Sequence, residues 1–307
     1  MTQKINLKIG HLRITDHLAL GITKHFYENG ELQFENLTLE TKSYSGWNPL
    51  AIDLRTGALD AACILVPISM ELFQNGIKLR LVLQTHKSGS VLIKNKRANI
   101  KSIEDFKGKT ILIPHYLSVH HLLFDKLLRD GGIPIGVKDV KFEVVAPSEI
   151  PEIMEWDEEG KVGGFIVAEP FGTQVVQAGY GEEFKLSKDI WQNHPCCVLV
   201  VREEIVKTNP DAVQELVNAF VKAGNIIKNE LEKTVVIGAA FLNQDISVVK
   251  HVLTEPFDRV TFTEMYPVIR DFDYIQTYMT SHIKAMSGKI DLNSFVDTSF
   301  AEKAGAK

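Results

Sequence analysis

Residues 101–121 read KSIEDFKGKTILIPHYLSVHH, and this stretch combines helix, strand and helix signals in an order that decides the fold class. Ser102, followed by two acids, is typical of a helix N-terminus. Gly108 predicts that this helix ends in a left-handed cap. The apolar run 110–113 is then expected to form a strand buried on both faces, before a second helix that carries His120. A strand ending in a polar turn ahead of a helix suits small anions and polar ligands, so the stretch predicts a binding cleft.

Strand and helix signals alternate on both sides of this stretch. Short apolar runs predict strands near residues 5–10, 36–42, 59–65, 79–86, 90–95, 109–113, 140–145, 163–168 and 197–202. Helical periodicity fills the gaps near 15–29, 48–57, 67–75, 117–130, 147–156 and 171–179. After about residue 203 helices take over, near 210–228, 231–242, 246–253 and 264–286. The pattern predicts an α/β protein with mostly parallel sheets flanked by helices and a helical C-terminal tail.

Nine strands would make a large single sheet, so two smaller lobes are expected instead. The adjacent runs at 79–86 and 90–95 resemble a crossover from one lobe to the other, and the stretch 183–200 would be the return. This predicts a discontinuous lobe I, residues 1–88 plus 195–307, and an inserted lobe II, residues 89–194. Two lobes joined by two strands form a hinge with a cleft between them.

Composition narrows the functional classes. The chain has 307 residues, of which 45% are hydrophobic, and a formal net charge of −5, which argues against a nucleic-acid-binding surface. It contains no run of 18 apolar residues, so no membrane span is expected. Its N-terminus passes directly into the first strand signal without the apolar region of a secretory signal. The protein is therefore expected either to be cytoplasmic or to be a mature form whose signal was removed.

Three cysteines do not make a disulfide framework. Cys63 lies in a predicted buried strand and is expected to be a small core residue. Cys196 and Cys197 are adjacent, and neighbouring cysteines rarely form a disulfide because the bond strains the backbone between them. Cys196 is expected in the core, and Cys197 is expected to be a neutral residue of the cleft.

Six short motifs connect the chain to a known family. They are Gly57-Ala58-Leu59-Asp60-Ala61-Ala62, Leu65-Val66-Pro67, Asp105-Phe106-Lys107-Gly108-Lys109, Gly131-Gly132-Ile133, Ala168-Glu169-Pro170-Phe171, and Ile190-Trp191 with His194-Pro195. In this order, over residues 5–228, they resemble the solute-binding proteins of nitrate, bicarbonate, sulfonate and thiamine-precursor importers. The resemblance implies a two-lobed fold of the type II periplasmic-binding-protein kind and a role in capturing a solute for an ABC importer.

The resemblance also implies particular site residues. A tryptophan after the second strand stacks on the ligand in this family, and Trp47 stands at that place. A histidine early in the helix after the Asp-x-Lys-Gly-Lys strand contacts the anion, and His120 matches it. Ala168 replaces the glycine of the family's Gly-Glu-Pro-Trp motif. Cys197 stands where nitrate binders carry a lysine, so this sequence lacks the charge that balances nitrate.

Further ligand-binding candidates follow from position. Thr15 lies at the start of the first helix, and Arg13 is the cation that we expect to meet an anionic ligand in the absence of the family lysine. Asp16 is expected to cap that helix or to contact the ligand. Glu169 ends a predicted strand at the cleft, and Ser69 lies where ligands of the family often contact the first lobe.

A metal site is an alternative use of part of this set. His115, His120, His194 and Cys197 could approach one cleft wall and would suit zinc or copper, although their spacings match no recognised metal motif. No catalytic motif is present, so we expect no enzymatic activity and no cofactor.

The sequence thus predicts a monomeric binding protein with one site for a small anion or heterocycle, working with an ABC transporter permease and without nucleic acid. Its location would then be periplasmic or at the cell surface. The alternative is a cytoplasmic ligand sensor on the same fold that regulates a partner protein.

Overall fold

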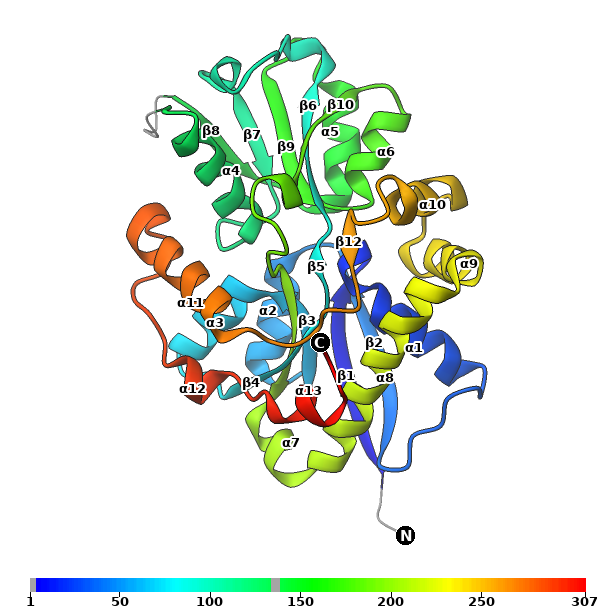
Figure 1. Ribbon diagram of the computed structural model, residues 1–307. Helices are drawn as coiled ribbons and strands as arrows, with labels where there is room; N and C mark the ends of the chain where they lie inside the picture. The colour runs from blue at the N-terminus through cyan, green and yellow to red at the C-terminus, as the bar shows by residue number, and fades with distance from the viewer. Residues whose placement is uncertain (1–3, 134–138) are drawn as a thin grey trace.

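The computed structural model describes residues 4–133 and 139–307 of the chain as two lobes, each built around a five-stranded sheet (Figure 1). Among the described residues, no helix combines the length and apolar character needed to cross a bilayer. The α/β class with helices flanking both sheets, predicted from the sequence, is confirmed. The sheets are mixed rather than mostly parallel as predicted, because each contains two parallel and two antiparallel pairs of neighbouring strands.

The first sheet has the strand order β2-β1-β3-β11-β4. Its strands are β1 (Ile5–Leu12), β2 (Leu37–Tyr44), β3 (Ala61–Leu65), β4 (Leu79–Gln84) and β11 (Cys197–Arg202). β1 runs parallel to β2 and β3, whereas β11 runs antiparallel to both β3 and β4. The carboxyl ends of β1 and β4 therefore meet the beginning of β11 at one edge of the sheet.

The second sheet has the order β10-β6-β9-β7-β8. Its strands are β6 (Ser90–Asn95), β7 (Thr110–Ile113), β8 (Lys141–Val144), β9 (Val162–Ala168) and β10 (Gly181–Leu186). β10 departs from the expected return crossing at 183–200, because its residues pair antiparallel with β6 before the chain leaves the lobe. Glu182 and Glu183 are exposed on this edge strand, so no apolar alternation marks it in the sequence.

Helices cover the sheets and build the C-terminal part. They are α1 (Leu18–Glu28), α2 (Trp47–Thr56), α3 (Val66–Gln74), α4 (Val119–Asp130), α5 (Ile150–Trp156), α6 (Phe171–Gln177), α7 (Glu203–Thr208), α8 (Pro210–Asn229), α9 (Leu231–Leu242), α10 (Ile246–Thr254), α11 (Ile269–Tyr278), α12 (Leu292–Phe295) and α13 (Ser299–Lys303). The predicted helix at 264–286 is too long. Pro267 precedes α11, and the residue before the helix, Val268, is extended, so the chain enters the helix only at Ile269.

The opening stretch 101–121 also differs in detail from its prediction. The helix at Ser102 is a single 3₁₀ turn, η3 (Ile103–Phe106), although Ser102 stands at its N-terminus as expected and forms a capping box with Asp105. Gly108 has a φ of +76°, in agreement with the predicted left-handed stop. Ser118 caps α4 by accepting a hydrogen bond from the amide of His121 at 3.1 Å.

Three segments pass side by side between the two sheets. Residues 85–89 lead from β4 to β6, and residues 187–196 return from β10 to β11. The amide of Ser88 donates to the carbonyl of His194 at 3.0 Å. On its other side, the short strand β5 (Lys87–Ser88) pairs with β12 (Val260–Thr261) of the C-terminal part, as Figure 1 shows. These crossings bring polar residues of distant sequence into the space between the sheets.

Candidate functional site

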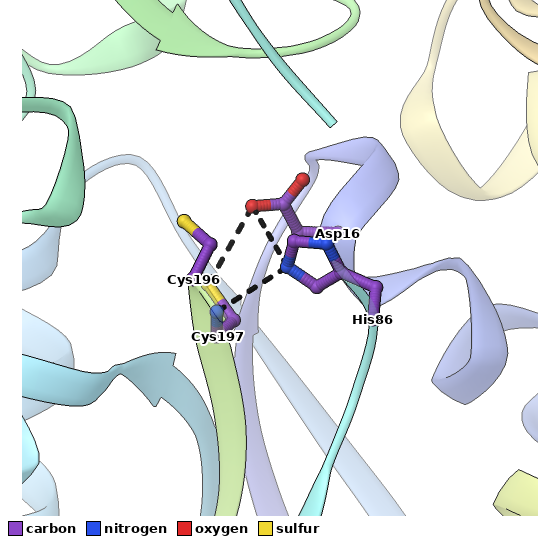
Figure 2. Close-up of side chains that lie close together, drawn as sticks. All are labelled: Asp16, His86, Cys196 and Cys197. Carbon is purple, nitrogen blue, oxygen red and sulfur yellow. Dashed lines mark hydrogen bonds and ion pairs between the residues drawn. The ribbon is translucent and has the colours of Figure 1, made fainter. Parts of the chain in front are cut away.

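Four side chains converge where the crossing segments meet the first sheet (Figure 2). Asp16 lies in the 3₁₀ turn η1 (Thr15–His17) after β1, and His86 follows the carboxyl end of β4. Cys196 and Cys197 stand at the beginning of β11. One potential donor atom from each of these residues lies within 4.8 Å of those of the others, and all four side chains are buried. We call this group the Asp-His-Cys-Cys cluster.

Short contacts hold the cluster together. His86 Nε2 lies 3.1 Å from Asp16 Oδ2, and Cys197 Sγ lies 3.6 Å from the same oxygen. The backbone nitrogen of Cys197 lies 3.3 Å from the same Nε2 atom of His86. Asp16 therefore does not act as the helix cap that the sequence suggested, since the carboxylate turns toward His86 and the turn has no side-chain cap.

Burial and mutual attraction compete in the Asp16–His86 pair. Burial raises the pKa of Asp16 to about 6, although attraction to His86 opposes this rise. Burial alone would lower the pKa of His86, but the Asp16 carboxylate outweighs it and raises that pKa to about 10. Both pKa values rise, but for different reasons, because burial dominates at the carboxylate whereas the negative neighbours dominate at the imidazole. Between these values both groups are charged and form a buried ion pair.

The two thiols sit in different electrostatic surroundings. Burial raises the pKa of Cys196, but the hydrogen bond with Cys197 and the proximity of His120 and His86 outweigh it and lower the pKa well below the ordinary value. Burial and the neighbouring Cys196 raise the pKa of Cys197. The third cysteine, Cys63, lies in the core of the first lobe, as predicted, and burial raises its pKa.

The second lobe contributes His120 from the first turn of α4. Its Nε2 atom lies 2.9 Å from Ser90 Oγ and 4.0 Å from Cys196 Sγ. The predicted site residues Ala168 and Glu169 adjoin this group, because Ser90 pairs with Ala168 and the carbonyl of Glu169 accepts from the amide of Thr15 at 2.8 Å. The structure thus brings residues of both lobes to one buried region.

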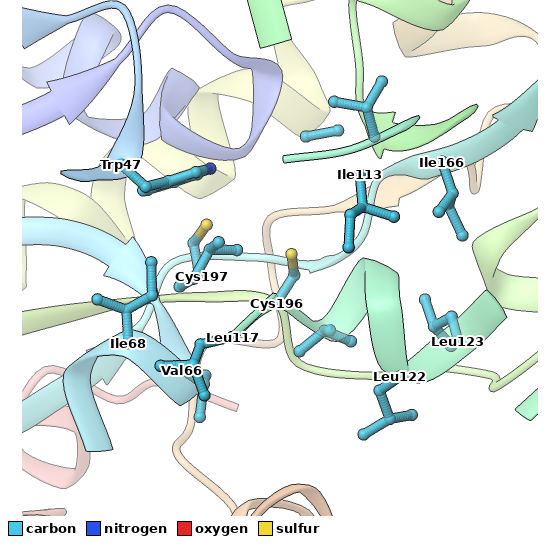
Figure 3. Close-up of a cluster of buried hydrophobic side chains, with 14 of the residues drawn as sticks. Trp47, Val66, Ile68, Ile113, Leu117, Leu122, Leu123, Ile166, Cys196 and Cys197 are labelled. Carbon is cyan, nitrogen blue, oxygen red and sulfur yellow. The ribbon is translucent and has the colours of Figure 1, made fainter. Parts of the chain in front are cut away.

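Trp47 closes the same region from the first lobe. Its side chain is 2% exposed and meets the ring of His17 edge to face at 5.9 Å. Figure 3 shows Trp47 in one apolar cluster with Cys196, Cys197 and residues of the second lobe, among them Ile113. The indole nitrogen has no hydrogen-bond partner among the described residues.

Other predicted residues lie elsewhere or are already engaged. The hydroxyl of Ser69 donates to the carbonyl of Val66 within its own helix at 2.7 Å. The carboxylate of Glu169 accepts from Thr173 and from Arg259, which lies 2.7 Å away. Arg13 is exposed and lines a separate pocket of about 250 Å³ between the lobes. That pocket is lined by Leu12, Arg13, Ile14, Ser43, Tyr44, Ser45, Pro147, Ser148 and Phe171.

The metal alternative of the sequence shares only Cys197 with the cluster. His115 is instead hydrogen-bonded within its surroundings, with Nε2 3.1 Å from Asn48 Oδ1 and Nδ1 accepting from the amide of Leu117. His194 is buried with its Nδ1 atom 3.2 Å from the carbonyl of Pro195. Burial lowers the pKa of His115 and of His194 to about 4, so both rings are neutral near pH 7.

Sequence reasoning missed His86 and left Asp16 open between a helix cap and a ligand contact. A usable signal exists, because Gln84, Thr85 and His86 form a polar run at the end of a buried apolar strand. Polar residues at the carboxyl end of a sheet strand are typical of ligand sites in α/β proteins.

Comparison with known proteins agrees with this architecture. Residues 2–240 match the NMT1-like family. The nitrate import ATP-binding protein NrtC of Synechocystis sp. is 28% identical over 240 residues, which are 72% of this chain and 35% of that protein. The nitrate/nitrite binding protein NrtA of Nostoc sp. is 27% identical over 70% of this chain and 52% of its own length. The chain thus spans about a third to a half of these curated relatives.

Two solved structures are similar over nearly the whole chain. The ligand-binding component of an ABC-type import system from Staphylococcus aureus, with zinc bound, has a TM-score of 0.87 at 25% identity and covers 98% of this chain and 99% of its own. The periplasmic nitrate-binding protein NrtA from Synechocystis PCC 6803 has a TM-score of 0.84 at 16% identity, over 99% and 89% of the two chains. On the match over residues 2–240, the chain belongs to the NMT1-like family.

Proposed function

We propose that this protein is the substrate-binding component of an ABC import system and captures a small solute between its lobes. The observation that carries this proposal is the buried polar region to which both lobes contribute, with His120 and Ser90 from the second lobe and the Asp-His-Cys-Cys cluster at the edge of the first sheet. Solute-binding proteins need such an arrangement, because a ligand that touches both lobes favours the closed form by its differential affinity.

The moving bodies in this proposal are residues 1–88 plus 195–307 and residues 89–194. The crossing segments 85–89 and 187–196 are where a hinge would act, because they are the short connections between the two sheets. The solute would contact Trp47, Thr15 and Cys197 on one side and His120, Ala168 and Glu169 on the other. Ser69 and Arg13 would act at the margin of the site.

Related proteins suggest two kinds of solute. Nitrate, nitrite and bicarbonate appear in the names of the curated relatives, and the Staphylococcus aureus structure has zinc bound. The buried region of this chain offers thiols and imidazoles, and its guanidinium, Arg259, is already paired with Glu169. A small solute that does not depend on a free cation, including a neutral heterocycle, therefore fits better than nitrate.

We further infer that the protein works as a monomer at the periplasmic face of a membrane permease, without nucleic acid. The related nitrate-binding protein is periplasmic, and the net charge of −5 disfavours a nucleic-acid partner.

A thermal-shift panel tests the binding function. It would compare nitrate, nitrite, bicarbonate, alkanesulfonates, pyrimidines and zinc on the full chain. A ligand present at 100 times its Kd adds about 2.7 kcal/mol, which raises Tm by about 4 °C for a chain of this length. No shift with any member, confirmed by calorimetry, would contradict the proposal.

Variants then test the location of the site. Trp47→Phe and His120→Gln are each expected to lower the affinity for the ligand found in the panel by about tenfold or more, because both side chains are buried at the junction of the lobes. Trp156→Phe is the matched control, since that indole is 70% exposed. Unchanged affinity in both test variants would place the site elsewhere.

A further inference from the structure

We propose that the Asp-His-Cys-Cys cluster is a binding site for one thiophilic divalent cation of the zinc type. The inference names the ligand class of the region described above, and it rests on the proposed function only for its role in uptake. Binding of the metal itself follows from Asp16, His86, Cys196 and Cys197 alone.

The geometry of the cluster comes close to a tetrahedral shell. Zinc–ligand bonds of about 2.0–2.3 Å at tetrahedral angles separate neighbouring donor atoms by roughly 3.3–3.8 Å. Here His86 Nε2 and Asp16 Oδ2 are 3.1 Å apart, and Cys197 Sγ is 3.6 Å from that oxygen. The complete set falls within 4.8 Å, so a contraction of about 1 Å at its widest separation closes the shell.

The donor set selects a class of metal. Two sulfurs and one imidazole nitrogen suit Zn²⁺ and other soft or borderline cations. Mg²⁺ and Ca²⁺ require six or more oxygen ligands in most sites, and the cluster offers the carboxylate of a single aspartate. When the metal binds, each coordinating thiol and the His86 imidazolium give up a proton, and the freed lone pairs on sulfur and nitrogen form the metal bonds.

Unpaired polar atoms gather in the same place. Among the described residues, nine buried side-chain atoms have no hydrogen-bond partner, and six of them belong to residues 15–17, 86, 120 and 194. They are Thr15 Oγ1, Asp16 Oδ1, His17 Nε2, His86 Nδ1, His120 Nδ1 and His194 Nε2. Each such atom costs about 1–3 kcal/mol when it is left without a partner, so this concentration indicates a region built to receive a ligand.

An apolar core would be a cheaper filling for this position. Asp16 and His86 are fully buried. Removing their charges from water costs free energy that a well-packed pair of hydrophobic residues at the same positions would not cost. A structural ion pair explains those two residues but gives no reason for two adjacent thiols within bonding reach of them. A metal ion explains all four residues together.

Neighbouring groups hold the thiols in position. The carbonyl of Cys196 accepts from the amide of Val66 at 3.1 Å, and the carbonyl of Cys197 accepts from the amide and the hydroxyl of Thr85. His120 Nε2, 4.0 Å from Cys196 Sγ, faces the cluster from the second lobe. We expect His120 to support the sulfur rather than to coordinate the metal, because Ser90 already engages its Nε2 atom at 2.9 Å.

The test uses the full chain, reduced and freed of metal by a chelator. Zn²⁺ is titrated by calorimetry, and Co²⁺ is titrated separately as a spectroscopic probe. The expected results are one ion per chain and a thiolate-to-cobalt charge-transfer band in the near ultraviolet. Cobalt binding without that band would overturn the proposal on the wild-type protein, whatever the variants do.

Single substitutions assign the ligands. Cys196→Ser and Cys197→Ser are each expected to weaken zinc binding by at least about 100-fold, and Asp16→Asn by at least about tenfold. Cys63→Ser is the matched control, because this third buried cysteine lies outside the cluster and should leave affinity within about twofold. Circular dichroism of the metal-free variants identifies any that fail to fold.

The outcomes separate the two proposals. Zinc binding that depends on both thiols supports the metal site. Binding of an anion or heterocycle from the panel, with no thiol-dependent zinc binding, overturns the metal site and leaves the solute-binding function standing. Failure of every ligand, zinc included, overturns both.

Discussion

Removal of the Arg259 guanidinium gives a stability test that the structure makes quantitative. Arg259 is 3% exposed and lies in the C-terminal part, but it reaches the second lobe, where Nη1 donates to Glu169 at 2.7 Å and Nη2 to Glu183 at 2.7 Å. Glu169 is fully buried. The variant Arg259→Met keeps much of the apolar stem and leaves the Glu169 carboxylate without its counter-charge.

The size of the effect follows from the ionisation of Glu169. Burial raises the pKa of this carboxyl above its ordinary 4.5, while Arg259 and two hydrogen bonds from Thr173 oppose the rise. Without Arg259 the folded state is expected to keep Glu169 protonated. Holding that proton at pH 7 costs at most about 1.36 kcal/mol for each of the 2.5 pH units above 4.5, or about 3.4 kcal/mol.

The sign of the pH dependence can be fixed in the same way. A carboxyl whose pKa is higher in the folded than in the unfolded state binds more protons when the protein is folded, so the folded protein loses stability as the pH rises. At pH 5 the cost falls below about 1 kcal/mol. Arg259→Met should therefore be destabilised by up to about 3.4 kcal/mol at pH 7, and this deficit should shrink to below about 1 kcal/mol at pH 5.

Urea unfolding at both pH values, followed by circular dichroism, measures these differences. Lys188→Met is the control, because its partner Asp258 is 66% exposed and such pairs contribute at most about 1 kcal/mol. The double variant Arg259→Met with Glu169→Gln should recover most of the loss. A deficit of the same size at pH 5 and pH 7 would refute the ionisation argument.

Two further variants test the packing and the buried histidines. Gly164→Ala should destabilise the second lobe by about 3 kcal/mol in urea unfolding, because a Cβ there would overlap the carbonyl oxygen of Ile93. Gly46→Ala is the control and should be nearly neutral, because its Cβ would have its nearest neighbour at 3.7 Å. His11 stacks on Phe241, and burial lowers its pKa to about 4, so the unfolded state binds more protons between that value and 6.5. Its contribution to the free energy of unfolding is full above pH 6.5 and falls by at most about 2.7 kcal/mol at pH 4.5. His11→Asn should remove up to this amount from the loss of unfolding free energy between pH 6.5 and pH 4.5, measured by urea unfolding. An unchanged pH dependence of the unfolding free energy would contradict the assignment.

The sequence was sufficient to place the strands that are buried on both faces. Runs such as 61–65 and 197–202 are almost wholly apolar, and a buried parallel or central strand leaves no room for polar residues. β10 was not predicted as a strand, because one side of an edge strand faces water and its sequence therefore has no apolar run. The helix at 264–286 was overextended because its periodicity continues through residues that Pro267 keeps out of the helix.

The candidate site was harder to predict, because it depends on which strand ends come together. His120, Thr15 and Cys197 could be proposed from local position and resemblance. The pairing of Asp16 with His86, 70 residues apart in sequence, follows from the antiparallel placement of β11 between β3 and β4. No periodicity encodes that order of strands, so the partner of Asp16 could not be inferred.

Charge balance in the buried region bears on the nature of the ligand. Asp16 is matched by His86, and Glu169 is matched by Arg259, so neither buried pair leaves a surplus charge. An anion that enters this region would have to give up its hydration without a free counter-charge from these pairs, which is costly in a buried site. A thiophilic cation meets the opposite situation, because the thiols of Cys196 and Cys197 can lose protons and supply the negative charge on binding. Cys197 therefore gives the cluster a donor that can take a metal ion.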